Sequence, residues 1–295
     1  MDLRFLQTFY WVAKLKSFAA AAEKLRIAQA TASHRVKTLE ADVGVVLLDR
    51  RTKRVVLTDA GTRLLSESPG MLKDWKELRE RIGLPAQEPD SIRLGVIESV
   101  LHAWLIPWIA QMRAEQPAFA LELKVDTTQS LLSLVDCGAL DIVVAALAAG
   151  DGVRKRVLAP MPMIFVGKEG LHTGKKRTLE QLAKHDLMTF QVGSQPHSEL
   201  LTQLREAKIK HSRVHAISSI SAIRQLVACG FGIATLPRAS LDAESSSAGL
   251  RALACDTELA PLSLFVSWRE SPTASAISTV VESLERAAKS FKPGR

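Results

Sequence analysis

The sequence of 295 residues has few cysteines and no long hydrophobic run. Its three cysteines, Cys137, Cys229 and Cys255, are far apart and form no Cys-x-x-Cys pair, which argues against a disulfide framework or zinc site and for a reducing compartment. The longest apolar run, residues 142–149, is much shorter than the roughly 18 residues that a membrane-spanning helix needs. The N-terminus has no positive segment followed by an apolar stretch, so we expect a cytoplasmic protein without a secretory signal.

The composition is that of a globular protein, and its positive charge is concentrated at one end. Hydrophobic residues make up 47% and charged residues 24% of the chain, which excludes disordered, collagen-like and coiled-coil classes. The length suggests two domains. Of the net charge of +8, residues 1–66 carry +6, with 12 Lys and Arg against 6 Asp and Glu. A basic segment on a near-neutral body predicts a polyanion partner, although a solvated surface is the alternative.

The first 43 residues predict three short helices. Residues 3–15 have helical apolar spacing, Ser17 can cap a helix over 18–25, and residues 28–43 have an apolar stripe on one side. A tight helix pair with a polar, cationic second member is typical of a helix-turn-helix, whose second helix contacts base edges and phosphates. The candidate groove-facing side chains of the third helix are Gln29, Thr31, Ser33, His34, Arg35 and Lys37.

A basic hairpin is predicted after the third helix. Short apolar strands over 46–48 and 55–57 flank a tip that contains Arg50, Arg51, Lys53 and Arg54. Four cations so close together repel one another, and a neighbouring phosphate backbone would explain them. The hairpin is therefore predicted to form a wing that contributes mainly sequence-independent affinity for DNA.

Residues 5–72 resemble the N-terminal domain of LysR-type transcriptional regulators. The resemblance implies a winged helix-turn-helix over residues 1–60. The chain has Ala28-Gln29-Ala30 where the family usually has Ser-Gln-Pro, and His34 where an Arg is usual, so no base preference is carried over. The matching residues are Phe9, Ser17, Phe18, Ala21, Ala22, Leu25, Gln29, Ser33, Leu39, Glu40, Val43, Gly44, Leu47, Leu48, Arg50 and 55–61.

Residues 61–90 form the predicted connector. The resemblance implies a linker helix that pairs with its twin in a homodimer or homotetramer, but its apolar stripe could instead pack on its own domain. Pro69-Gly70 interrupts the helical pattern, so we expect a bent or split helix, and residues 85–89 are expected to form a polar hinge. The stripe consists of Leu64, Leu65, Met71, Leu72, Trp75, Leu78 and Ile82.

Residues 91–295 alternate between strand-like and helix-like segments, which predicts an α/β domain with largely parallel sheets. The resemblance continues through Gly138-x-Leu140-Asp141 and residues 230–237. It implies two doubly wound lobes, as in periplasmic binding proteins, with an effector between them. We expect lobe I over 91–160 and 268–295, and lobe II over 161–267.

Hydroxyl and amide side chains follow several predicted strands of this domain. Ligands of open α/β sheets bind beyond the carboxyl ends of the strands, near helix N-termini, and such groups suit a small anion or carboxylate. Ordinary helix capping is the alternative, and Phe231 could equally be a core residue. Ser99 and Thr128 match the family's ligand positions. The candidate effector-binding residues are Ser99, Val100, Thr127, Thr128, Gln129, Gln191, Ser194 and Phe231.

Searches for catalytic motifs favour a protein that is not an enzyme and has no cofactor. There is no Gly-x-Ser-x-Gly motif, and residues 170–176 lack the spacing of a phosphate-binding loop. His211 and His215 have the spacing of a metal pair but no obvious third ligand, so no metal site is expected. Family members that sense peroxide use a close cysteine pair, whereas Cys229 and Cys255 are 26 residues apart.

The sequence thus predicts a DNA-binding transcription regulator of LysR type that a small, anionic effector controls. Its expected partners are double-stranded DNA, the effector and further copies of the chain, with no membrane. Two alternatives stay open: a two-lobed enzyme or carrier with an accessory basic domain, and an architectural DNA-binding protein that needs no ligand.

Overall fold

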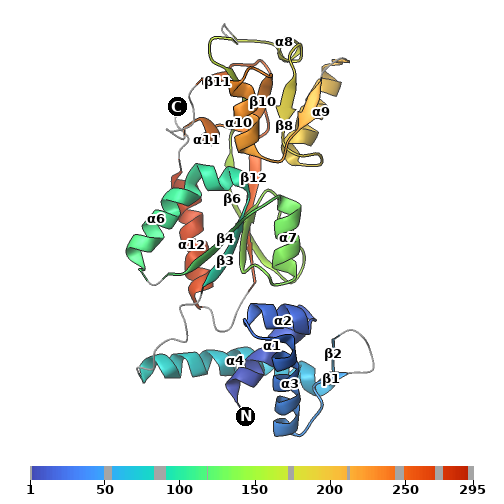
Figure 1. Ribbon diagram of the computed structural model, residues 1–295, viewed down its shortest axis with the longest axis vertical. Coiled ribbons are helices and arrows are strands. Elements are labelled where there is room, and N and C mark those ends of the chain that lie inside the picture. The colour runs from blue at the N-terminus through green and yellow to red at the C-terminus, as the bar shows by residue number, and fades with distance from the viewer. Residues whose placement is uncertain are drawn as a thin grey trace.

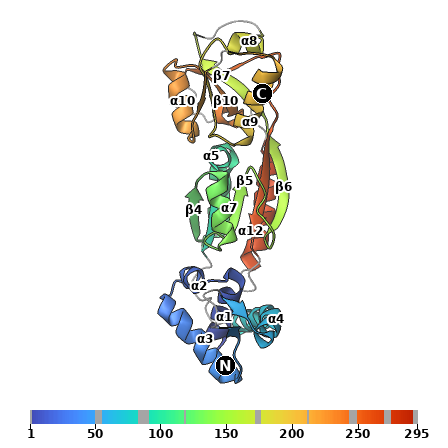
Figure 2. The ribbon, with the colours of Figure 1, turned by 90° about the vertical axis from the view of Figure 1, so that its right-hand side faces the viewer.

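The computed structural model describes residues 2–49, 55–82, 91–117, 119–171, 176–210, 213–242, 249–269 and 275–291. These residues form three bodies stacked along one axis (Figures 1 and 2). We call them the head (residues 2–82), lobe I (91–161 and 262–291) and lobe II (163–253). The expected hinge at 85–89 and the wing-tip residues Arg50, Arg51, Lys53 and Arg54 lie outside the described residues.

The head contains the three predicted helices and a short two-stranded sheet. Ser17 caps the second helix, since its side chain accepts a hydrogen bond from the Ala20 amide at 3.2 Å. Phe9 and Val36 are fully buried in the core between the helices. The winged helix-turn-helix prediction is confirmed. The elements are α1 (Leu3–Leu15), α2 (Phe18–Lys24), α3 (Gln29–Val43), β1 (Leu48–Asp49) and β2 (Val56–Leu57), with the two strands antiparallel.

The turn from α3 to the wing depends on a glycine and a carboxylate. Gly44 ends α3 with a φ of 73°, a left-handed conformation that glycine adopts without steric cost. The Glu40 carboxylate accepts hydrogen bonds from the amides of Leu47 and Leu48 at 2.9 and 3.2 Å. These contacts fix the direction in which the wing leaves the recognition helix.

The connector forms one continuous helix, α4 (Asp59–Arg81), with Pro69 inside it, so of the expected bent or split helix the split is wrong. A proline removes one backbone donor, but packing on the head supports this helix on both sides of it. Ser68 is fully buried, with its hydroxyl bonded to the Leu64 carbonyl, and Leu72 is only 3% exposed. The second half of the helix leaves its apolar stripe exposed, at Met71, Trp75, Leu78 and Ile82.

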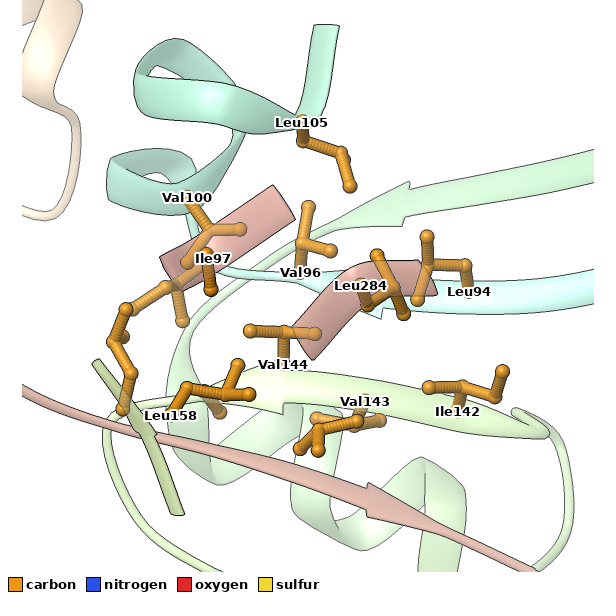
Figure 3. Close-up of a cluster of buried hydrophobic side chains, with 14 of the residues drawn as sticks. Leu94, Val96, Ile97, Val100, Leu105, Ile142, Val143, Val144, Leu158 and Leu284 are labelled. Carbon is orange, nitrogen blue, oxygen red and sulfur yellow. The ribbon is translucent and has the colours of Figure 1, made fainter. Parts of the chain in front are cut away.

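Lobe I is built on a five-stranded sheet of order β4-β3-β5-β12-β6. Strands β4, β3 and β5 are parallel, whereas β12 runs antiparallel to both of its neighbours. Leu94, Val144 and Leu284 are fully buried in its core (Figure 3). The elements are β3 (Ile92–Val96), α5 (Glu98–Val100), a π-helical turn (Leu101–Leu105), α6 (Ile106–Glu115), β4 (Leu121–Val125), α7 (Thr128–Asp136), β5 (Ile142–Ala145), β6 (Arg154–Met161), β12 (Leu262–Trp268) and α12 (Ser275–Ser290).

Lobe II repeats this plan with a five-stranded sheet of order β11-β7-β10-β8-β9. Strands β10, β8 and β9 are parallel, whereas β7 is antiparallel to β10 and β11. Helix α10 packs on this sheet through fully buried Ile223 and Val227. The elements are β7 (Met163–Lys168), α8 (Leu179–Leu182), β8 (Leu187–Thr189), α9 (Gln195–Glu206), β9 (Val214–Ala216), α10 (Ile220–Ala228), β10 (Ile233–Pro237), α11 (Ala239–Asp242) and β11 (Leu250–Leu253).

Two expectations about this domain need correction. The sheets are mixed, because each combines three parallel strands with two antiparallel ladders. Strand β12 belongs to the sheet of lobe I, so the chain leaves lobe II before residue 262 rather than at 268. The two strands β6 and β12 cross between the lobes and pair with each other. Among the described residues, no helix is long and apolar enough to cross a membrane.

Candidate DNA interface and interlobe cavity

Helix α3 presents a polar face to solvent. Ala32, Val36 and Leu39 are fully buried against the head, as the predicted stripe requires. The six candidate groove-facing side chains lie off this stripe. Gln29, His34 and Lys37 are exposed, and Thr31, Ser33 and Arg35 are partly exposed.

The N-terminus of α3 has no side-chain cap. Its N-cap residue is Ala28, which makes no capping hydrogen bond, whereas Ser17 caps the preceding helix. The first amides of a helix point along its axis and carry partial positive charge. In α3 these amides are left available for an external acceptor such as a phosphate oxygen.

A buried ion cluster fixes the head on lobe I. Asp141, which precedes β5, pairs with Lys24 of α2 and with Arg93 of β3 at 3.0 Å. Burial alone would raise the pKa of Asp141, but the Arg93 hydrogen bond and the Lys24 charge hold this pKa below its ordinary value. The Lys24 ammonium also lies 4.3 Å from the centre of the Trp11 ring. The head and lobe I are thereby joined at the N-terminal ends of β3 and β5.

A cavity of about 250 Å³ lies at the opposite ends of these strands, between lobe I and lobe II. Its walls come from the segments that follow β3, β4 and β8, and from the start of α10. Of the candidate effector-binding residues, the structure brings five together there. The residues that line the cavity are Ile97, Glu98, Ser99, Val125, Asp126, Thr127, Thr128, Ala146, Phe190, Gln191, Ser194, Pro196, Ser218, Ile220 and Leu262.

Three candidate residues do not line this cavity. Val100 is fully buried in the core of lobe I (Figure 3), and Gln129 is exposed on α7. Phe231 precedes β10 and meets the His215 ring edge to face, with ring centres 5.1 Å apart. Strands β10 and β8 are parallel, and Phe231 lies at their N-terminal ends. The cavity lies at the C-terminal ends of these strands.

Capping accounts for some of the hydroxyl groups. Thr127 accepts a hydrogen bond from the Ser130 amide at the start of α7, and Ser194 accepts one from the His197 amide at the start of α9. Ser99 caps no helix and is only 5% exposed. Thr127 and Ser194 therefore both cap a helix and line the cavity, while Ser99 only lines the cavity.

Glu98 is the cavity residue that sequence reasoning missed. Its carboxylate reaches from lobe I to the N-terminus of α10 in lobe II, where it accepts hydrogen bonds from the amides of Ile220 and Ser221 at 2.8 and 3.1 Å. The Ser221 hydroxyl adds a third bond at 2.8 Å. Burial alone would raise the pKa of Glu98, but these hydrogen bonds hold it below its ordinary value.

The electrostatics of the cavity do not fit the expected small anion. Glu98 and Asp126 are the charged residues among its described lining, which contains no Lys or Arg. Asp126 accepts hydrogen bonds from the Thr127 amide and the Ser130 hydroxyl, which lower its pKa. Both carboxylates are therefore ionised and face the same space.

The histidines and cysteines outside the cavity form no metal site and no disulfide among the described residues. His215 lies 3.0 Å from the Asp186 carboxylate, and His211 is outside the described residues. No described residues form a group of three or more possible metal ligands. Cys137, Cys229 and Cys255 form no disulfide bonds with one another, and burial raises the pKa of the Cys255 thiol.

A helix-turn-helix head joined to two α/β lobes around a cavity defines a DNA-binding regulator with a ligand-binding domain. Residues 3–62 match the model of the bacterial regulatory helix-turn-helix protein, lysR family, and residues 85–289 match the LysR substrate binding domain. The chain belongs to the LysR family of transcriptional regulators. It is a DNA-binding regulator with an effector-binding domain.

Similar proteins cover nearly the whole chain. The DNA-binding transcriptional dual regulator OxyR of Escherichia coli is 27% identical over 261 residues, which span 86% of this chain and 85% of OxyR. The regulator CfxR of Cupriavidus necator is 29% identical over 250 residues, or 83% of this chain and 78% of CfxR.

Solved structures share the fold over a similar extent. A full-length OxyR variant from Pseudomonas aeruginosa has a TM-score of 0.64 at 21% identity, covering 100% of this chain and 97% of that one. Full-length CbnR complexed with its target DNA has a TM-score of 0.55 at 19% identity, covering 98% of this chain and 100% of that one.

Proposed function

We propose that α3 reads DNA through its solvent-exposed polar face. The observation that carries this proposal is the uncapped N-terminus of α3, with exposed amide, hydroxyl and cationic side chains on the same surface. These groups match the donors and acceptors of the major groove. The proposed base and phosphate contacts are Gln29, Thr31, Ser33, His34, Arg35 and Lys37, with Arg50, Arg51, Lys53 and Arg54 of the wing on the phosphates.

We propose that a small molecule in the interlobe cavity controls this DNA binding. The cavity is bounded by both lobes, so a ligand that contacts both favours one degree of closure over another. Such a ligand shifts the equilibrium only through its difference in affinity for the two states, typically about 1–3 kcal/mol. Ser99, Thr127, Thr128, Gln191 and Ser194 supply the hydrogen-bonding groups.

The exposed stripe of α4 is proposed as the contact with a second copy of the chain. Met71, Trp75 and Leu78 of this helix, and Ile82 directly after it, are 40–58% exposed. Exposed apolar residues at helical spacing mark an interaction surface, and pairing two copies would place two α3 helices on one DNA. The same contact serves a homodimer and a homotetramer.

The two alternative functions have weaker support. An enzyme would need a catalytic constellation, and the described residues that line the cavity include no His, Lys or Cys that could act as a base or an activated nucleophile. We therefore propose a non-enzymatic regulator that acts in the bacterial cytoplasm, where its DNA is. Burial raises the pKa of the Cys255 thiol, which disfavours a role of this residue as a reactive thiol.

The experiment that tests this function is selection of genomic DNA fragments by the purified full-length protein at near-physiological salt, followed by sequencing. A few retained fragments that share an interrupted palindrome are expected for a dimeric regulator. Retention without a shared site would favour an architectural DNA-binding protein, and the absence of retention would contradict the proposal.

A further inference from the structure

The N-terminus of α10 faces a carboxylate that belongs to the chain itself. Both oxygens of Glu98 accept hydrogen bonds there, from the Ile220 amide at 2.8 Å and from the Ser221 amide and hydroxyl at 3.1 and 2.8 Å. Helix N-termini bind the anionic groups of ligands through the same kind of amides. Glu98 therefore occupies the place in lobe II where a ligand carboxylate or phosphate would otherwise bind.

The N-terminus of α7 is occupied in the same way, and that of α9, which also borders the cavity, is capped by the Ser194 side chain. The two oxygens of Asp126 accept hydrogen bonds from the Thr127 amide at 2.7 Å and from the Ser130 hydroxyl at 2.8 Å. An anionic ligand would meet two ionised carboxylates and, among the described lining residues, no Lys or Arg. Like charges at such short range in a partly buried site are strongly unfavourable.

The hydrogen-bonding groups that remain available are uncharged. Ser99, Gln191 and Ser218 line the cavity, and their side chains make no hydrogen bond within the described part of the chain. Apolar side chains such as Phe190 and Leu262 form much of the remaining wall. Ligand sites of this kind combine an apolar wall with a few polar groups that orient the ligand.

We propose that Glu98 is a specificity-determining residue of the interlobe cavity. Its carboxylate takes the place of a ligand anion at α10, closes lobe I on lobe II, and restricts the effector to small, uncharged molecules with hydroxyl or amide groups. The class of effector rests on the ligand control proposed above. The role of Glu98 in closure rests only on its hydrogen bonds across the lobes.

The role in closure can be tested by chemical rescue in the full-length protein. Glu98→Ala removes the carboxylate and should lower the melting temperature by roughly 3–10 °C, since hydrogen bonds to a charged group are lost. Sodium acetate should restore most of this loss relative to equal sodium chloride, because acetate fits the vacated position. The wild type should not respond. Glu115→Ala, at the exposed end of α6, is the matched control and should show neither effect.

A second variant keeps this test decisive if Glu98→Ala folds poorly. Glu98→Gln fills the same space without the charge, so its melting temperature should lie between the other two and should not respond to acetate. Failure of acetate to rescue Glu98→Ala, or equal stabilisation of the wild type by acetate, would overturn the assignment.

The class of effector can be tested with matched pairs of uncharged and anionic probes. Acetamide and acetate, or benzamide and benzoate, differ mainly in charge. The wild type should be stabilised more by the amides, and Glu98→Ala should gain a response to the carboxylates. A wild type that prefers benzoate would overturn the proposed class. Acetate rescue of Glu98→Ala with no wild-type response to any probe would retain the role in closure and contradict the assigned ligand class.

Discussion

Lobe I contacts its two neighbours at opposite ends of the same strands, and the two contacts differ in kind. At the N-terminal ends, Asp141 and Arg93 meet Lys24 of the head. Their side chains are only 9–12% exposed. At the C-terminal ends, Glu98 meets lobe II beside a cavity, and its side chain is 21% exposed.

This difference separates a fixed joint from an adjustable one. Opening the joint at the head would separate Lys24 from Asp141, which meet with little exposure to solvent, so this contact has no ready alternative arrangement. The Glu98 contact lies next to space that a ligand can occupy. Ligand binding is therefore expected to change the contact between the lobes and to leave the contact with the head intact.

Strand β3 connects the two contacts directly. It carries Arg93 near one end and leads into Glu98 at the other, about 16 Å away at the usual rise of a strand. A strand inside a five-stranded sheet moves with the whole sheet. A change in lobe closure would thus move lobe II relative to lobe I, while lobe I and the head turn together as one unit.

The largest effect is expected from Asp141→Ala, which leaves Lys24 and Arg93 buried without a counter-charge. Removal of one partner from a buried ion cluster typically costs about 3–5 kcal/mol. Thermal unfolding should show this loss, together with independent melting of the head. Asp136→Ala, an exposed carboxylate nearby, is the control. Equal melting temperatures of the two variants would contradict the fixed joint.

A smaller effect is expected from Gly138→Ala, which also affects the head joint. Gly138 has a φ of 77°, and an added Cβ would lie 2.4 Å from the Leu15 side chain of α1. The backbone strain costs about 1 kcal/mol, and the clash adds to it. Combining this change with Leu15→Ala should cost less than the sum of the two single changes. Additive losses of unfolding free energy would show that Gly138 and Leu15 are not in contact.

The contact between the lobes should depend on pH through Glu98. Because the pKa of Glu98 is lowered in the folded protein, its contribution is present above the ordinary value and is lost as the pH falls through the folded value. In Glu98→Gln, the melting temperature should fall less between about pH 5 and pH 3 than in the wild type. Parallel curves for the two proteins would contradict this role. Asp141 also becomes protonated as the pH falls, but it does so in both proteins. It therefore does not affect the difference between their melting temperatures.

The smallest effect is expected at the wing. Arg51→Ala should weaken binding to all DNA sequences alike and reduce the salt dependence of the affinity by about one unit of slope, because one phosphate contact is lost. Lys37→Ala on α3 provides a comparison on the recognition helix. Titrations at several salt concentrations measure the slope, and an unchanged slope for Arg51→Ala would exclude it from phosphate binding.

The sequence predicted well what local patterns determine. The helices of the head follow from apolar spacing, and the capping residue Ser17 correctly marks the start of α2. The hydroxyl groups at strand ends also came together, because parallel strands end at the same edge of a sheet. Ser99 and Thr128 lie in the cavity for this reason.

Contacts between distant segments could not be predicted in this way. Glu98 and Ile220 are 122 residues apart, and nothing local to either residue indicates that the lobes bring them together. The return of β12 to lobe I is another pairing across the chain. Phe231 was misplaced because a glycine-flanked aromatic residue gives no sign of the edge of the sheet on which it lies.

The joint between head and lobe I is expected to stay fixed while the contact between the lobes adjusts. Paired spin labels on a chain whose three cysteines are replaced by serine test it directly. One pair, at Glu23 and Glu115, spans head and lobe I, and another, at Glu115 and Glu206, spans the lobes. Glu98→Ala should broaden or shift only the second distance distribution. A change in both distances, or in the head distance alone, would contradict the account.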